Sequence, residues 1–387
     1  MLVYGVLRQR WQIEALLNQL LSKPLKAKDS DIKLLLMMAT FQLLDTRVPD
    51  YAAVDAAVKL VQKTGKSWAK GMVNGVLRNI TRQRDELLSK IKSDEQAFYS
   101  HPQWMIEKIK TDWPDNWQPI LQANNQQAPM TLRVNAQHFT AQQYAEKLNI
   151  DTELNSGNEQ ALMLQQACDV NELPGFKEGW FSVQDAGAQL AARLLDCQKG
   201  HHVLDCCAAP GGKTCHILEL EPDVSMLAVD ISESRLHRVE ENLHRLGLSA
   251  RLVTGSAEAP EDWWDKQLFD RILLDVPCSA SGVIRRHPDI KSLRREEDIN
   301  ALVATQQNIL KKIWPLLKPG GRLLYATCSI FKQENEQQIE SFLSTTEEAS
   351  EVIINQSWGQ SRTHGRQILP GDQGMDGFYY AILQKNT

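Results

Sequence analysis

The spacing of apolar residues predicts an all-helical first part of the chain. Up to residue 92, hydrophobic side chains recur at i, i+3 and i+4, which is the period of an α-helix. Four such stripes begin at Leu16, Ile32, Val54 and Met72. Another stripe starts at Leu2 with no capping residue before it, so we expect the sequence to begin part-way into a helix.

A second pattern, the alternation of strands and helices, fills residues 181–387. Short apolar runs typical of buried strands lie at 202–205, 226–230, 251–254, 270–275 and 322–326. Helices are expected at 233–246 and 297–317, and an antiparallel final strand at 377–383. This alternation predicts an α/β fold with a doubly wound, mostly parallel sheet. Residues 93–180 are polar and mixed, and we expect a small α+β connecting segment there, with short strands near 131–135 and 180–183.

Composition narrows the class of protein. Of 387 residues, 42% are hydrophobic and 24% charged, as in soluble globular proteins. No run of 18 apolar residues occurs, so we expect no membrane span, and the first residues lack the features of a signal peptide. The seven cysteines are odd in number and irregularly spaced, unlike a disulfide framework. We therefore expect a cytoplasmic protein, and we expect a monomer.

Positive charge is concentrated in two stretches although the net charge is −5. Residues 59–92 hold nine Lys and Arg against two acids, and residues 283–295 hold five against one. Basic faces of this kind can neutralise phosphates in a nucleic acid. The alternative interpretation is an ordinary solvated helix face.

Two cysteines stand where two predicted strands end. An Asp-Val-Pro-Cys motif runs from Asp275 to Cys278, and a Thr-Cys pair ends at Cys328. The carboxyl ends of neighbouring parallel strands form the reaction crevice of an open α/β sheet. Two thiols placed there suggest nucleophilic catalysis through a covalent intermediate. The alternative, a buried inert thiol, is kept for Cys168, Cys197, Cys206 and Cys215.

The glycine-containing loop at 205–214 indicates a nucleotide-like ligand. A phosphate-binding P-loop would need glycine at position 207, which is Cys207, and the dinucleotide fingerprint is absent. Asp230 ends the next strand, where an acid binds ribose hydroxyls. An adenosine ligand without pyrophosphate, such as S-adenosylmethionine, fits these features. The alternative is a tight strand-to-helix turn with no ligand. The nearby His and Cys residues contain no Cys-x-x-Cys pair, so we expect no metal.

These motifs together resemble the NOL/NOP/Sun family of RNA 5-methylcytosine methyltransferases. The resemblance rests on the loop at 205–214, the motif at 274–280 and the motif at 326–329, and it covers nearly the whole chain. Within the family, the helical start and the run at 282–291 are most similar to the bacterial members that methylate small-subunit ribosomal RNA. The resemblance implies a class I, Rossmann-like methyltransferase domain at 181–387, preceded by a NusB-like RNA-binding domain at 1–92.

The resemblance also implies roles for individual residues. Cys328 is the nucleophile that adds to cytosine C6, Cys278 assists product release, and Asp275 lies where cofactor and base meet. Lys213 orients the base or closes the loop against the sheet. The S-adenosylmethionine site comprises Cys207, Ala208, Ala209, Pro210, Gly211, Gly212, Lys213, Asp230, Arg235, Ser256 and Asp275. The implied product is 5-methylcytosine in 16S rRNA, at cytosine 967.

Two departures from the family pattern leave alternatives open. Ser256 stands where relatives often carry an acid that contacts the adenine side of the cofactor, and the next acid is Glu258. Relatives also have more helix before the equivalent of Tyr4. The alternatives are the same chemistry on tRNA, or an RNA-binding assembly factor that no longer catalyses methyl transfer.

Chemistry at C5 and C6 requires the target base to be unstacked and inserted into a pocket. We expect the basic run after Cys278 to hold flanking phosphates of the small-subunit rRNA. Its cationic residues are Arg285, Arg286, Lys291, Arg294 and Arg295.

Overall fold

The computed structural model describes residues 2–387, which divide into two compact units. Unit 1 is the chain up to Gln127 together with Ile284–Arg294. Unit 2 is Ala128–Val283 together with Arg295–Thr387. The basic segment that follows Cys278 thus belongs to the helical unit, although the strand before it belongs to the other. The domain boundaries expected at residues 92 and 180 stay a prediction, because sequence domains and compact units need not divide at the same residue.

Unit 1 is helical, as the sequence predicts. Its helices are α1 (Leu2–Arg8), α2 (Arg10–Leu20), α3 (Ser30–Asp45), α4 (Asp50–Lys63), α5 (Ala69–Lys90), α6 (Glu95–Tyr99), α7 (Gln103–Asp112), α8 (Trp117–Asn124) and α13 (Ile290–Leu293). The four predicted stripes fall on α2 to α5, and their inner residues form one core. Buried members of that core include Leu16, Ile32, Ala57 and Val73.

Unit 2 contains a mixed sheet in the order β11-β12-β13-β9-β8-β5-β6-β7, with β10 pairing to β13. The parallel strands are β5 (His202–Cys206), β6 (Ser225–Asp230), β7 (Arg251–Thr254), β8 (Phe269–Asp275) and β9 (Leu317–Thr327). The antiparallel additions are β10 (Ala349–Val352), β11 (Gln360–Ser361), β12 (Arg366–Ile368) and β13 (Phe378–Lys385). The predicted doubly wound sheet is confirmed, as is its antiparallel last strand.

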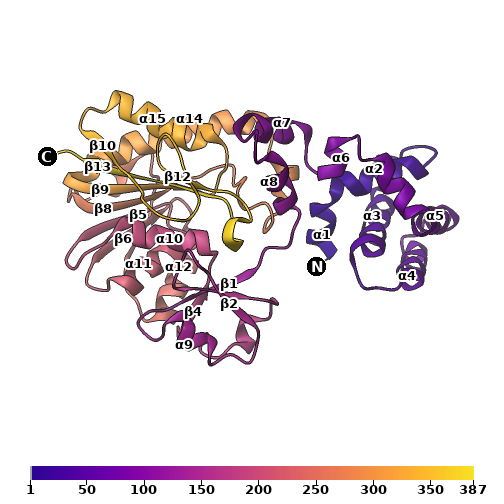
Figure 1. Cartoon of the computed structure of the whole chain (residues 1–387), viewed down its shortest axis with the longest axis horizontal. Coiled ribbons are helices and arrows are strands. Elements are labelled where there is room, and N and C mark those ends of the chain that lie inside the picture. The colour runs from indigo at the N-terminus through magenta and orange to yellow at the C-terminus, as the bar shows by residue number, and fades with distance from the viewer. Residues whose placement is uncertain (1) are drawn as a thin grey trace. The chain divides into compact units, whose positions relative to one another are not determined.

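Helices cover both faces of this sheet (Figure 1). Helices α10 (Ala186–Leu195), α11 (Gly212–Leu220) and α12 (Glu233–Leu246) share a hydrophobic cluster with one face, and α14 (Glu296–Ile313) and α15 (Glu336–Thr345) with the other. Successive residues of β5 point to opposite faces of the sheet, so Val203 belongs to the first cluster and Leu204 to the second. The strand order reverses beside β5, so the carboxyl ends of β5 and β8 mark the expected ligand crevice.

One predicted helix is too long. The pattern suggested a helix at 297–317, but α14 ends at Ile313 and a short 3₁₀ turn, Trp314–Leu316, follows. Pro315 lies in that turn and has no N–H to continue the helical hydrogen bonds. The chain therefore leaves the helix early, and Leu317 already belongs to β9.

A second, smaller sheet in unit 2 carries the order β2-β3-β1-β4. Its strands are β1 (Met130–Val134), β2 (Thr152–Leu154), β3 (Ala161–Leu164) and β4 (Phe181–Val183), all antiparallel, with α9 (Ala141–Ala145) beside them. The strands expected near 131–135 and 180–183 are confirmed. Arg133 of β1 is 1% exposed and forms a two-pronged ion pair with Glu219 of α11, at 2.9 and 2.7 Å. This buried pair joins the small sheet to the helix that follows the glycine loop.

None of the helices within residues 2–387 combines the length and the apolar character needed to cross a membrane.

Candidate active site

A cavity of about 350 Å³ opens at the carboxyl ends of the parallel strands in unit 2. It is lined by eight of the residues that the sequence singled out: Cys207, Ala209, Asp230, Arg235, Ser256, Asp275, Cys278 and Cys328. Ala208, Pro210, Gly211, Gly212 and Lys213 belong to the same loop but do not line the cavity. Lining residues that sequence reasoning missed are Val229, Ile231, Gly255, Ala257, Val276, Pro277, Thr305 and Ile309. The thiols and the acids predicted from separate strands therefore face one space.

The loop after β5 brings its backbone to the edge of the cavity. Gly211 precedes α11 with φ of 92°, and an added Cβ would lie 2.9 Å from Val239 Cγ1. Only glycine meets both demands, a left-handed backbone and close packing against α12. Cys207 also has a positive φ, 65°, which turns the chain out of the strand. Burial raises the pKa of the Cys207 thiol to about 12, so this cysteine keeps its proton at neutral pH.

Asp230 is fixed at the end of β6 by the loop that it faces. Its carboxylate accepts hydrogen bonds from the N–H of Ala209 at 3.0 Å and the N–H of Ser232 at 3.1 Å. Arg235 approaches the same carboxylate at 3.4 Å and donates to the carbonyl of Ala209 at 2.7 Å. The next residue, Ile231, is 71% exposed at the cavity. An apolar side chain beside a fixed acid suits a ligand with a flat ring joined to a sugar.

Ser256 stands where relatives often carry an acid, and the structure shows what surrounds this serine. The Ser256 hydroxyl accepts the N–H of Glu258 at 3.2 Å, a turn contact that uses the side chain locally. Glu258 itself lines the cavity, and Asn308 of α14 donates to its carboxylate at 2.7 Å. A carboxylate is therefore present at this wall of the cavity, two residues later than the family pattern places it.

The two site cysteines are in direct contact. Their Sγ atoms lie 3.4 Å apart, Cys278 is buried, and Cys328 is partly exposed to the cavity. The hydrogen bond to Cys328, together with burial, raises the pKa of the Cys278 thiol well above its usual value. Cys278 therefore keeps its proton at neutral pH. The geometry distinguishes the two thiols by exposure, because Cys328 is the more accessible sulfur.

A lysine and a carboxylate flank the thiols. Lys213 Nζ lies 2.5 Å from Asp275 Oδ2 and 5.6 Å from the ring centre of Phe378. Burial alone would lower the pKa of Lys213, but the attraction and hydrogen bond of Asp275 outweigh it, and the pKa is raised. The ammonium therefore stays charged. Lys213 is placed to stabilise negative charge beside it in the cavity wall.

Glu334, which sequence reasoning missed, ties the two cysteine loops together. Its side chain is fully buried and accepts the N–H of Ser279 at 2.8 Å and the hydroxyls of Ser279 and Ser329 at 2.5 Å each. Gln306 donates to the same carboxylate at 3.1 Å and to the carbonyl of Pro277 at 2.9 Å. Each loop thus has a donor on one carboxylate, directly after its cysteine. The sequence offered no signal for this role except an acid soon after Cys328.

Asp205, at the end of β5, yields a pH-dependent prediction. Burial raises its pKa from 3.8 to about 7, although Thr214 donates a hydrogen bond of 2.6 Å to it. Between these pH values the folded protein holds a proton that the unfolded chain has released, so stability falls as pH rises. Asp205→Asn cannot ionise. We expect its unfolding free energy, relative to wild type, to increase by about 2–3 kcal/mol from pH 5 to pH 8.

Urea denaturation of both proteins at the two pH values measures this difference. All other titrating groups are shared by the two proteins and cancel. A difference in unfolding free energy that does not change with pH would show that Asp205 is already ionised in the folded protein at pH 5.

Two residues expected to contact RNA lie in the interior of unit 1. Arg285 is 3% exposed and Lys291 is 1% exposed. Lys291 donates to the carbonyl of Arg8 at 2.6 Å, to the carbonyl of Ser100 at 2.7 Å and to the side chain of Asn125 at 2.8 Å. Burial lowers its pKa well below the usual value. The burial of these two side chains contradicts the expectation that they are accessible to phosphates. The Lys291 side chain instead anchors segment 284–294 to distant parts of the chain.

The other three cations of that run differ in exposure. Arg286 and Arg294 are half-buried, and Arg295 is exposed at the start of α14. Their contact with RNA stays a prediction. Within residues 2–387, no group of three or more potential ligands is arranged to hold a metal ion.

Known proteins match this chain along its whole length. The 16S rRNA methyltransferase RsmB/F family matches residues 192–384, the ferredoxin-like domain of RsmF/B-like methyltransferases matches 101–171, and the NusB family matches 1–82. The Ribosomal RNA small subunit methyltransferase B of Vibrio cholerae is 49% identical, over 99% of this chain and 88% of that protein. The protein of the same name from Pseudomonas syringae is 46% identical, over 99% and 88%.

Among solved structures, a methyltransferase homologue from Pyrococcus horikoshii is 27% identical with a TM-score of 0.66, over 76% of this chain and 98% of that one. The fold, the two cysteines at the ends of β8 and β9, and these similarities agree. The chain belongs to the RsmB/F family of 16S rRNA methyltransferases and is a methyltransferase.

Proposed function

We propose that this methyltransferase forms 5-methylcytosine in small-subunit rRNA, at cytosine 967, through a covalent bond between Cys328 and C6 of the base. The observation that carries the proposal is the 3.4 Å contact between a buried, protonated thiol and a more exposed one in a single cavity. Amino-group methylation would have no use for two thiols at this place.

The cavity fits S-adenosylmethionine, which supplies the methyl group when bound. Asp230 would hold the ribose and Ile231 would contact the adenine ring, while the backbone of the loop from Cys207 to Gly212 would border the remainder. Val229 and Ile309 are apolar members of the cavity wall. The absence of a P-loop agrees with a ligand that carries no phosphate.

Catalysis uses the more accessible of the two thiols as the nucleophile. Cytosine C5 is a weak nucleophile, and addition of the Cys328 sulfur to C6 makes C5 electron-rich enough to take the methyl group. The C5 proton must then leave, and the Cys328–C6 bond must break as the ring double bond re-forms. Asp275 and Cys278 lie beside Cys328 and serve these proton transfers. Lys213 stabilises charge on the adduct from its position beside Asp275.

The proposal is tested with protein-free small-subunit rRNA that carries tritium at cytosine C5. We expect wild type to release one tritium for each methyl group transferred from S-adenosylmethionine, with the product mapped to one cytosine. Methyl transfer without tritium release would place the methyl group elsewhere on the base. Transfer to tRNA instead would indicate the same chemistry on another RNA. Cofactor binding without any transfer would favour a non-catalytic assembly factor.

Glu258 is expected to replace the missing acid at Ser256 in cofactor binding. Glu258→Ala removes a carboxylate that Asn308 holds at the cavity wall, and a hydrogen bond to a charged group contributes roughly 1.5–3 kcal/mol. We expect the Kd for S-adenosylmethionine to rise about 10-fold or more, measured by titration calorimetry. Glu261→Ala is the matched control, because Glu261 lies nearby but does not line the cavity. Equal affinities of the two variants would contradict the assignment.

A further inference from the structure

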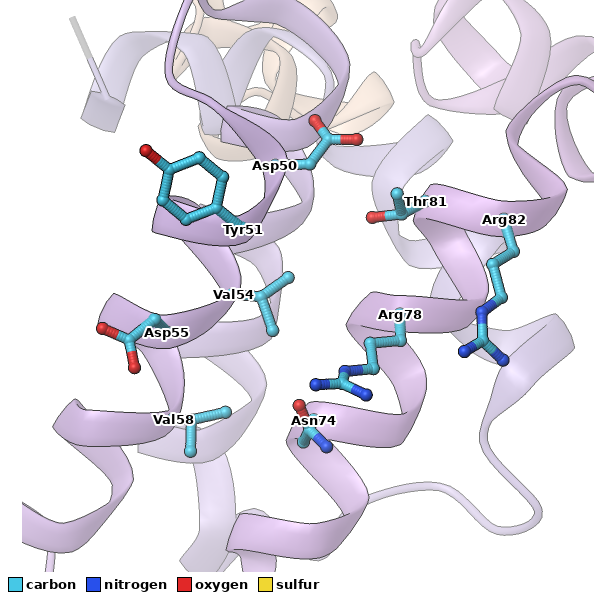
Figure 2. Close-up of a pocket in the computed structure, with 9 residues that line it drawn as sticks. All are labelled: Asp50, Tyr51, Val54, Asp55, Val58, Asn74, Arg78, Thr81 and Arg82. Carbon is cyan, nitrogen blue, oxygen red and sulfur yellow. The ribbon is translucent and has the colours of Figure 1, made fainter.

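A groove of about 570 Å³ lies between α4 and α5 of unit 1, remote in sequence from the catalytic residues. Figure 2 shows its two walls: Tyr51, Val54 and Val58 on α4, and Asn74, Arg78 and Arg82 on α5. Arg78 extends from α5 toward α4 (Figure 2). The floor is apolar, and the α5 wall is cationic.

The charges of this groove are not balanced within it. Asp55 pairs with Lys59 at 2.7 Å, and Asp50 lies 3.5 Å from Arg84, so both carboxylates have a cation on the rim. Arg78 and Arg82 are exposed, and among the described residues neither guanidinium has a hydrogen bond or ion pair. Two arginines one helical turn apart, about 6 Å along the axis, are thus available to anions from outside.

An aromatic ring completes the groove. Tyr51 is 79% exposed and stands beside the apolar floor of the groove. Unpaired bases stack on such rings, while arginines take the phosphates of the same strand. An acidic peptide would use the arginines but has no comparable need for the exposed ring.

The surface beside the arginines is bare. Gly71 and Gly75 precede Arg78 and Arg82 on the same stripe of α5, and an added Cβ on either meets no atom within 4 Å. Glycine weakens a helix, and packing within the unit does not require it here. A helix without side chains at these positions leaves room for a strand to lie against it.

We propose that this groove binds a single-stranded segment of the substrate RNA, with phosphates on Arg78 and Arg82 and a base on Tyr51. The inference rests on the proposed function for its RNA, and it assigns a second point of contact on the helical unit. The sequence predicted that Arg285 and Lys291 contact RNA phosphates, but both are buried. In this proposal, Arg78 and Arg82 make phosphate contacts instead.

The test is filter binding of the full chain to protein-free small-subunit rRNA across a range of salt concentrations. Arg78→Glu/Arg82→Glu is expected to weaken binding at least 10-fold at low salt. Each lost phosphate contact on a single strand reduces the slope of log affinity against log salt by about 0.7, so the slope should fall by about 1.4. Lys90→Glu/Lys92→Glu makes the same change of charge at the last residue of α5 and just beyond it, and should alter affinity less than about 2-fold.

Two further variants separate local contact from general electrostatics. Tyr51→Ala should weaken binding about 5-fold without changing the salt slope, as expected for a lost stacking contact. Gly75→Leu changes no charge and should raise the melting temperature while weakening RNA binding, which excludes misfolding as the cause.

Methyl transfer measured on the same RNA distinguishes this inference from the proposed function. A higher KM for RNA with unchanged kcat in Arg78→Glu/Arg82→Glu supports the groove. Groove-dependent RNA binding without methyl transfer by wild type would support the groove and overturn the function. Normal methyl transfer with an unchanged salt slope in the variant would overturn the groove. The groove proposal would also be overturned if Arg78→Glu/Arg82→Glu bound the rRNA normally but lost binding to a small-subunit ribosomal protein.

Discussion

Cys328→Ala is expected to lower the rate of methyl transfer at least about 10⁴-fold and to leave the Kd for S-adenosylmethionine within about 2-fold of wild type. Without the sulfur, no covalent bond to C6 forms, and C5 is not activated. In the proposed site, cofactor affinity depends on Asp230, Glu258 and the glycine loop, which the substitution does not change. Single-turnover transfer of labelled methyl groups and calorimetry measure the two quantities.

Cys278→Ala is the informative partner of that variant. It keeps the nucleophile and removes the buried thiol beside it, so addition to the base can proceed while release is slowed. We expect a covalent protein–RNA species that migrates slowly on a denaturing gel, which Cys328→Ala cannot form. Cys197→Ala, a cysteine outside the cavity, is the control and should resemble wild type. An adduct in Cys328→Ala and none in Cys278→Ala would reverse the two roles.

Arg133→Met is expected to lower the unfolding free energy of unit 2 by about 3–5 kcal/mol. The substitution leaves the buried carboxylate of Glu219 without its cation, and breaking a buried pair costs roughly that much. Arg133 also donates to the carbonyl of Gly212 at 2.6 Å and to the side chain of Gln184 at 2.5 Å. Loss of these two contacts loosens the start of α11, so cofactor affinity should fall as well.

A double variant separates the two effects of Arg133. In Arg133→Met/Glu219→Leu no buried charge is left unpaired, and such replacements recover most of the lost stability. The contact with Gly212 remains absent, so cofactor affinity should stay low. Urea denaturation and calorimetry on wild type, single and double variants measure both. A double variant as unstable as the single one would show that the ion pair is not the source of the stability.

The strands and the placement of the two thiols could be predicted from local sequence. Buried parallel strands read as continuous apolar runs, and the residue that ends such a run lies at the crevice edge. Cys278, Cys328 and Asp230 were found in this way, and the cavity indeed contains all three. Helical periodicity, a different local rule, failed near Pro315. It predicted a helix up to Leu317, but α14 ends at Ile313.

Other site residues act through contacts that local sequence does not record. Glu334 meets Ser279 across 55 positions, and Arg133 meets Glu219 across 86. A buried acid and a buried arginine look like surface residues in the sequence, because burial of a charge is acceptable only when a partner arrives from elsewhere in the fold. Glu258 lies in an exposed turn, and its contact with Asn308 of α14 at the cavity wall is likewise not recorded in the local sequence.

The sequence by itself determined the helical and α/β parts of the chain, because these depend on periodicity. It also determined which acids and cysteines follow the parallel strands, because these residues stand where the apolar runs end. Only the tertiary structure decided which cations are available to RNA. Lys291 and Arg285 belong to one basic run, yet both are buried, and three distant acceptors hold Lys291. Arg78 and Arg82 belong to the other basic stretch but stay exposed beside a groove, because packing of α4 against α5 leaves them unpaired.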